Sequence, residues 1–69
     1  MTYTIAERNN AILLIANGEA DFTNTVFYER LQEFNWIVIT KVNATITSAE
    51  LTYAGKDLLR RLLKNNKLL

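Results

Sequence analysis

The residues of this chain that could do binding chemistry are cations near its C-terminal end. Lys56, Arg60, Lys64 and Lys67 recur at steps of three or four residues, and Arg61 lies beside them. Side chains at this spacing share one face of a helix. The pattern predicts a basic stripe with two open interpretations. It either binds nucleic acid or another acidic partner, or stays solvated and complements the helix C-terminus.

Catalytic chemistry has little support. The 69 residues contain no Cys and no His, so the usual nucleophile systems and the usual ligands of zinc, iron–sulfur clusters and haem are missing. No glycine-rich phosphate loop is present, and Glu7, Glu19 and Asp21 are scattered over a predicted helix surface and a connector. We therefore expect a protein that is not an enzyme and that uses no metal or cofactor.

The length predicts one domain over residues 1–69, near the lower limit for independent folding. A hydrophobic content of 49% argues against disorder. The net charge of +1 gives no general attraction to nucleic acid, so any such binding must depend on local clustering. No apolar run reaches the roughly 18 residues of a membrane span, and the N-terminus lacks the features of a secretory signal. We expect a soluble, cytoplasmic protein without membrane contact.

Two helices are predicted in the first half. Thr4 and Glu7 have capping-box spacing, which predicts a helix over residues 5–16. Its apolar residues include one shared face, formed by Ile5, Ile12 and Ala16, and three further positions that point elsewhere, Leu13, Leu14 and Ile15. The second helix begins near residue 25, is capped by Thr23, Asn24 or Thr25, and buries Phe27, Leu31 and Phe34. Asn35 suits the left-handed position after it.

The next segments are rich in β-branched residues and predict a hairpin, with strands at 36–42 and 45–51 around the turn Asn43-Ala44. With so tight a turn, one face holds Trp36, Val38, Thr40, Thr47, Ala49 and Leu51. Ile37, Ile39 and Ile46 then lie on the opposite face. Trp36 is interpreted as a core residue rather than a base-stacking platform.

The start of the last helix has two interpretations. Thr47 and Glu50 also have capping-box spacing, so a helix from Ser48 is possible. We prefer a strand to Leu51, with Thr52 as the N-cap of a helix from Tyr53, because residues 45–47 favour β-structure and the preceding strand needs a partner.

The element order, together with Leu31, Trp36 and Ile37 and the segment "ELTYAGKDLL", resembles the winged-helix DNA-binding domains, notably those of MarR-like and PadR-like regulators. In the second segment, the residues that match the family pattern are Leu51, Thr52, Gly55, Lys56, Leu58 and Leu59. The resemblance implies an α+β fold, a small winged-helix-like domain with the order helix-helix-strand-strand-helix. The connector "EADFTN" is too short for the separate helix that such domains normally carry. The domain would therefore be a reduced form, as small phage and prophage regulators are.

The resemblance implies that the second helix enters the major groove of double-stranded DNA. Asn24 and Gln32 would read base edges, Thr25 and Tyr28 would hold phosphates, and Lys41 near the wing tip would touch the backbone. Ordinary solvated residues are the competing interpretation, since Glu29 and Glu33 on the same helix would repel DNA. The expected function is a small DNA-binding transcriptional regulator, and the alternative is a protein-interaction module with the same fold.

Self-association is expected as well. Leu14 lies away from Ile12 on the first helix, and the hairpin would carry Ile37 and Ile39 on a second apolar face. Such surfaces require cover, and a symmetric dimer is the commonest way to supply it. The sequence therefore predicts a homodimer with Leu14, Ile37 and Ile39 in the interface.

Overall fold

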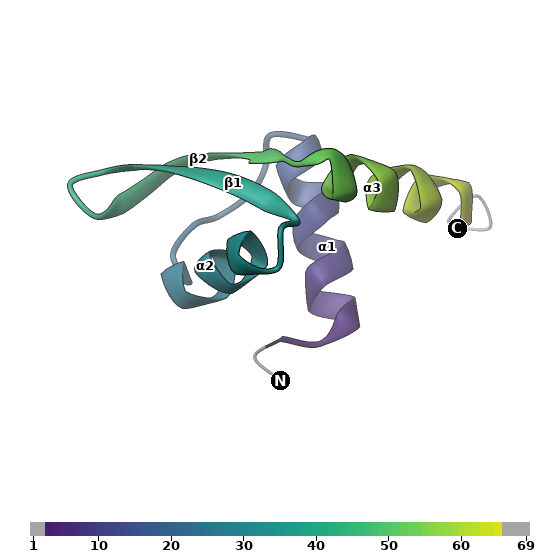
Figure 1. Ribbon diagram of the computed structural model, residues 1–69, viewed down its shortest axis with the longest axis horizontal. Coiled ribbons are helices and arrows are strands. Elements are labelled where there is room, and N and C mark those ends of the chain that lie inside the picture. The colour runs from purple at the N-terminus through teal and green to yellow at the C-terminus, as the bar shows by residue number, and fades with distance from the viewer. Residues whose placement is uncertain (1–2, 66–69) are drawn as a thin grey trace.

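The computed structural model describes residues 3–65 and shows a small α+β domain in the expected order. Its elements are α1 (Ile5–Ala16), α2 (Thr25–Glu33), β1 (Ile37–Val42), β2 (Thr45–Leu51) and α3 (Tyr53–Asn65). The hairpin and α3 follow one another along the long axis, α1 crosses at their junction, and α2 lies against β1 (Figure 1). The order and class predicted from the sequence are confirmed. Lys67 of the predicted basic stripe lies outside the described residues.

Helix α1 begins at the predicted capping box. The Glu7 amide donates to Thr4 Oγ1 at 3.0 Å, and the Thr4 amide donates to Glu7 Oε1 at 2.8 Å. The helix ends before Gly18, whose φ of 72° takes the left-handed conformation. The predicted apolar face is only partly right, because Ile12 is fully buried whereas Ile5 and Ala16 are exposed. The residues of α1 that are buried are Ala11 and Ile12, and α3 and β2 pack on this helix.

Helix α2 takes the middle one of its three candidate caps. Asn24 Oδ1 accepts a hydrogen bond from the Phe27 amide at 3.2 Å. The helix buries Tyr28 and Leu31, while Phe34 stays 59% exposed. Phe34 follows the last helical residue and packs edge-on against Tyr3, with ring centroids 5.7 Å apart. Of the predicted apolar stripe, Leu31 is buried and Phe27 is half-buried against the core, whereas Phe34 is exposed. Tyr28 is buried although it was not predicted to belong to the stripe.

The turn between α2 and β1 follows the prediction. Asn35 has a φ of 68°, and the Trp36 amide donates back to the Leu31 carbonyl at 3.0 Å. A left-handed residue followed by a bond of this kind is the usual helix C-terminus. It turns the chain directly from α2 into β1.

The hairpin has the predicted turn and keeps Ile37, Ile39 and Ile46 on one face, but the two faces otherwise differ from the prediction. Asn43 and Ala44 have φ values of 52° and 67°, as a two-residue hairpin turn requires. Lys41 pairs with Ile46, but Thr40 pairs with Ser48, so Thr47 is an extra residue in a β-bulge.

The bulge moves residues 48–51 to the other face, because side chains alternate along a strand. Ile37 and Ile39 therefore pair with Leu51 and Ala49 and pack toward the core. The predicted face that joined Val38 to Ala49 is wrong. The open face instead carries Val38 and Val42, each 56% exposed.

Strand β2 runs to Leu51, so the alternative of a helix from Ser48 is excluded. Thr52 Oγ1 accepts from the Gly55 amide at 3.1 Å and caps α3 as predicted. The core draws on all five elements and comprises Ala11, Ile12, Tyr28, Leu31, Ile37, Ile46 and Leu58. Trp36 is half-buried against this core, as the sequence indicated.

Candidate nucleic-acid interface

The first turn of α2 lies beside the tip of the hairpin. A hollow of about 430 Å³ separates them, lined on one side by Asp21, Phe22, Thr23 and Thr25 and on the other by Ala44, Thr45 and Ile46. Two of the surfaces that the sequence assigns to DNA contact, the helix N-terminus and the wing, are thus brought together by the fold.

Tyr28 is wrongly assigned as a phosphate contact. It is only 4% exposed, and its ring packs edge-on against Phe22 and Phe27 at centroid distances of 5.0 and 5.1 Å. Burial raises the pKa of the Tyr28 phenol, and the Asp21 carboxylate raises it further. The helix turns this residue inward because it packs against both the connector and the hairpin.

The polar side chains expected to read bases are partly engaged in the fold. Asn24 uses its oxygen to cap α2, as described above, and Thr25 is half-buried. Gln32 is exposed, and its Oε1 accepts a hydrogen bond from the Ile39 amide at 2.8 Å. Both amide groups keep their NH2 donors for an outside acceptor. Their side-chain oxygens already accept hydrogen bonds within the protein.

Lys41 lies on β1 rather than at the turn itself, and its ammonium group forms an ion pair with Glu29 of α2. The neighbouring Arg30 pairs with Glu33 at 2.8 Å on the same helix. Within the described residues, both cations of α2 and the hairpin therefore have carboxylate partners. This surface offers hydrogen-bond donors but little free positive charge.

The basic residues of α3 are differently placed. Lys56, Arg60, Arg61 and Lys64 are all exposed. Asp57 is their one acidic neighbour in the helix and pairs with Arg61 at 2.9 Å and, more loosely, with Arg60 at 3.6 Å. Tyr53, which the sequence interpretation did not single out, begins the same helix and is 88% exposed. A step of 100° per residue places Tyr53 on the same side of the helix as Arg60 and Lys64, so the helical periodicity of the sequence could have identified it.

Trp36 is held by packing and polar contacts. Its Nε1 donates to the Tyr3 hydroxyl at 3.2 Å, and the Arg8 guanidinium lies 4.9 Å from the ring centroid. A ring engaged on its edge and on one face contributes to the fold. This arrangement favours the core interpretation of Trp36 over base stacking.

The predicted dimer interface needs one correction. Ile37 is 1% exposed and packs in the core of the single chain, so it cannot face a partner. The cause is the packing of its face of β1 onto the core, with Ile39, Ala49 and Leu51 on the same side of the hairpin. Ile39 is half-buried against the same core, and Leu14 is half-buried beside a shallow hollow between α1 and α2.

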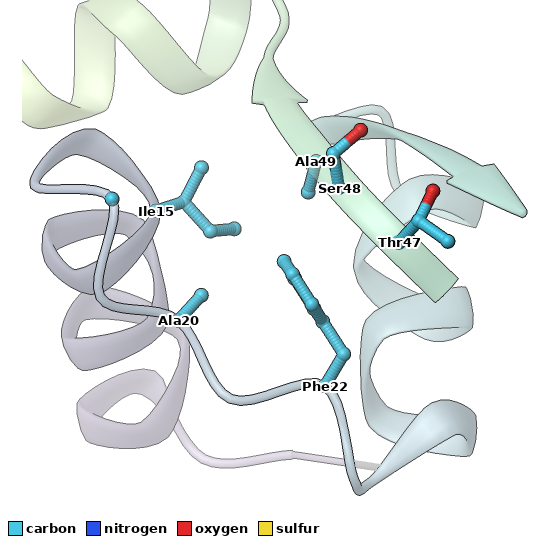
Figure 2. Close-up of a pocket in the computed structure, with 7 residues that line it drawn as sticks. Ile15, Ala20, Phe22, Thr47, Ser48 and Ala49 are labelled. Atoms are coloured by element: carbon cyan, nitrogen blue, oxygen red, sulfur yellow. The ribbon is translucent and has the colours of Figure 1, made fainter. Parts of the chain in front are cut away.

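A third hollow, of about 200 Å³, lies between α1, the connector and β2 (Figure 2). Its lining consists of Ile15, Gly18, Ala20, Phe22, Thr47, Ser48 and Ala49. Apart from two hydroxyl groups on β2, these side chains are apolar or absent. None of these lining residues is an acid or a base that could activate the hydroxyl groups as nucleophiles.

Comparisons with protein-family models, with curated proteins and with solved structures found no match to this chain. Among the described residues, no helix is long and apolar enough to cross a membrane. No group of three or more potential ligand side chains in residues 3–65 is arranged to hold a metal ion.

Proposed function

We propose that this protein is a small DNA-binding transcriptional regulator of the cytoplasm, acting as a homodimer through a winged helix. The observation that carries the proposal is the position of the first turn of α2 beside the hairpin tip, across one shared hollow. Recognition helices contact base edges with their N-terminal residues. In the winged-helix proteins that the sequence resembles, the adjacent hairpin touches the DNA beside that helix.

Two side-chain contacts support the proposal by joining α2 to β1. Glu29 pairs with Lys41, and one turn later Gln32 accepts from the Ile39 amide. Gln32 binds the backbone amide of Ile39 and Glu29 binds the side chain of Lys41, so α2 is fastened to two neighbouring points of β1. Helix and hairpin therefore approach a duplex as one preformed unit, which reduces the entropy lost on binding.

In this proposal Asn24 and Gln32 act as donors. Their NH2 groups would reach base acceptors such as N7 and O6 in the major groove. The Thr25 hydroxyl and Lys41 would contact phosphates and position the helix without reading sequence. The ammonium group of Lys41 has three N–H donors, so it can bind a phosphate and keep Glu29 as its partner.

Paired substitutions test these roles without removing structural bonds. Asn24→Asp keeps the cap oxygen and Gln32→Glu keeps the acceptor for the Ile39 amide, but each loses its NH2 donor. In a selection of duplexes from a mixed pool, both should change the preferred sequence. Asn10→Asp makes the same chemical change on the exposed surface of α1 and should preserve the preference. Wild-type protein that binds no duplex at low salt would contradict the proposal.

A protein-interaction module is the second candidate, favoured by the paired cations of α2 and the hairpin. A surface without free positive charge lacks the phosphate attraction that supplies much of the affinity for DNA. The same elements expose Val26, Phe34 and Val38. Titration with duplex DNA separates the candidates, because binding with a steep salt dependence favours the regulator and its absence favours the module.

For the homodimer, we propose the open face of the hairpin as the interface. Val38 and Val42 are each more than half exposed, and Thr40 lies between them on the same face of β1. Burying exposed apolar area contributes about 25 cal/mol per Å². This face takes the place of the one that Ile37 was expected to supply.

A further inference from the structure

The formal charges of this chain are segregated between α3 and the other elements. Within the described residues, α3 carries four cations against one carboxylate, a net charge of +3. The remaining described residues carry three cations, Arg8, Arg30 and Lys41, against six carboxylates, a net charge of −3. The overall net charge of +1 conceals this separation. A polyanion is attracted to α3 and repelled by the rest.

The exposed cations of α3 form a continuous face together with one aromatic ring. Tyr53, Arg60 and Lys64 fall within roughly 40° of one another around the helix axis, opposite the buried Leu58 and the half-buried Leu62. Lys56 and Arg61 flank them, and the axial step from Lys56 to Arg60 to Lys64 is about 6 Å. We call these five residues the α3 cationic face. The side chains of Arg60 and Arg61 are 73% and 72% exposed.

The opposite side of α3 is already occupied by the fold. Leu58 is buried, and Leu59 and Leu62 are half-buried against α1 and β2. A helix that binds at a membrane surface needs a free apolar face to insert. The packing of α3 therefore favours a partner that uses charge.

An aromatic ring in line with cations suits nucleic acid. Lysine and arginine neutralise phosphates and release counterions. An exposed tyrosine donates its hydroxyl to a phosphate or stacks on an unpaired base. At 88% exposure Tyr53 is far more exposed than Tyr28 at 4%, and its position places its ring beside the cations.

We infer that the α3 cationic face binds the sugar-phosphate backbone of nucleic acid and supplies the electrostatic affinity that the α2 surface lacks. The inference deepens the proposed function and rests on it for the identity of the polyanion as duplex DNA. Asp57 limits this affinity, because its carboxylate forms ion pairs with Arg60 and Arg61 and lowers the net positive charge of the helix. Phosphates compete with its carboxylate for both guanidinium groups.

The test is a titration of a labelled mixed-sequence duplex with the full chain at several salt concentrations between about 50 and 200 mM. Lys56→Gln and Lys64→Gln should each lower the slope of log affinity against log salt by about 0.9. Asp57→Asn should bind more tightly than wild type at the lowest salt. Tyr53→Ala should weaken binding and leave the slope unchanged. Tyr53, Lys56 and Lys64 are exposed and the side chain of Asp57 is 40% exposed, so circular dichroism should show an unchanged fold.

Arg30→Gln is the matched control, because it removes one positive charge from α2 and changes the net charge by the same amount. Its slope should equal that of wild type. An equal fall in slope for Arg30→Gln and Lys64→Gln would show that the slope depends on net charge alone, and it would overturn the inference. So would polyglutamate that competes for the protein as well as the duplex does, since the face would then suit any acidic polymer.

The outcomes also separate this inference from the proposed function. If Lys41→Ala lowers the slope and the α3 variants do not, the α3 assignment is wrong and the regulator proposal stands. If the α3 variants lower the slope but wild type binds every duplex equally, the cationic face is supported and a sequence-specific regulator is not. If wild type binds no nucleic acid at low salt, both fail.

Discussion

Gly55 and Gly18 are the two glycines of the chain, and each is required for a different reason. At Gly55 an added Cβ would collide with the backbone carbonyl of Trp36, which the Thr52 amide holds by a hydrogen bond of 3.1 Å. At Gly18 the space is open, but the φ of 72° disfavours a side chain. One position is therefore limited by packing and the other by backbone conformation.

Gly55→Ala should destabilise the protein by roughly 1–3 kcal/mol, the range for overpacking, although alanine is the better helix former. Gly18→Ala should cost about 1–2 kcal/mol from the left-handed backbone alone. Urea unfolding of both variants measures the difference. The close approach at Gly55 would be contradicted if Gly55→Ala proved as stable as wild type.

The buried phenol of Tyr28 predicts an alkaline limit to stability. Its raised pKa means that folding favours the neutral form. The stabilisation is complete below the unfolded value near 10 and is lost as pH rises through the folded value. Between pH 8 and pH 11, the urea midpoint of wild type should fall further than that of Tyr28→Phe. Tyr53→Phe removes an exposed phenol and should behave like wild type, whereas equal losses in all three proteins would contradict this account.

At the scale of elements, the hairpin turn carries avoidable strain. Ala44 has a φ of 67°, which an L-residue with a Cβ adopts at a penalty of roughly 1–2 kcal/mol. Ala44→Gly should therefore raise the unfolding free energy by about 1 kcal/mol, since Asn-Gly is the preferred pair for such turns. Ala16→Gly, in the exposed last turn of α1, should lower it by about 0.5–1 kcal/mol. Thermal melts of the two variants should shift in opposite directions.

Thr52 connects two junctions of the chain at once. Its hydroxyl caps α3 and also donates to the Asn35 carbonyl at 2.5 Å, so it joins the α2–β1 turn to the β2–α3 turn. Thr52→Val should remove both bonds at a cost of about 1–2 kcal/mol. Thr4→Val removes a hydroxyl that caps α1 alone. It should cost less, and a loss equal to that of Thr52→Val would show that the Asn35 bond contributes nothing.

For the whole molecule, the open face of the hairpin predicts self-association. The melting temperature should rise with protein concentration, because association stabilises the folded chain. Val38→Glu should abolish this dependence. Val26→Glu places the same charge on another exposed valine, 63% exposed on α2, and should retain it. A wild-type melt that is independent of concentration would rule out the dimer.

The sequence by itself determined the boundaries of the elements. Thr4 with Glu7, Asn35, Asn43-Ala44 and Thr52 mark ends or turns that the structure confirms. These features work through hydrogen bonds and backbone conformations that span only a few residues. Their outcome depends on local chemistry that is fully present in the sequence. The α+β class follows from the same signals.

Only the tertiary structure decided which side chains face the core and which remain for binding. The bulge at Thr47 brought Ala49 and Leu51 onto the face of Ile37, the packing of α2 buried Tyr28, and Lys41 met Glu29 across twelve residues of chain. A single extra residue in a strand exchanges its two faces, and an ion pair between elements depends on how they dock. Which side chains are buried and which ion pairs form depends on packing between elements that are far apart in the chain. The periodicity within one segment cannot predict it.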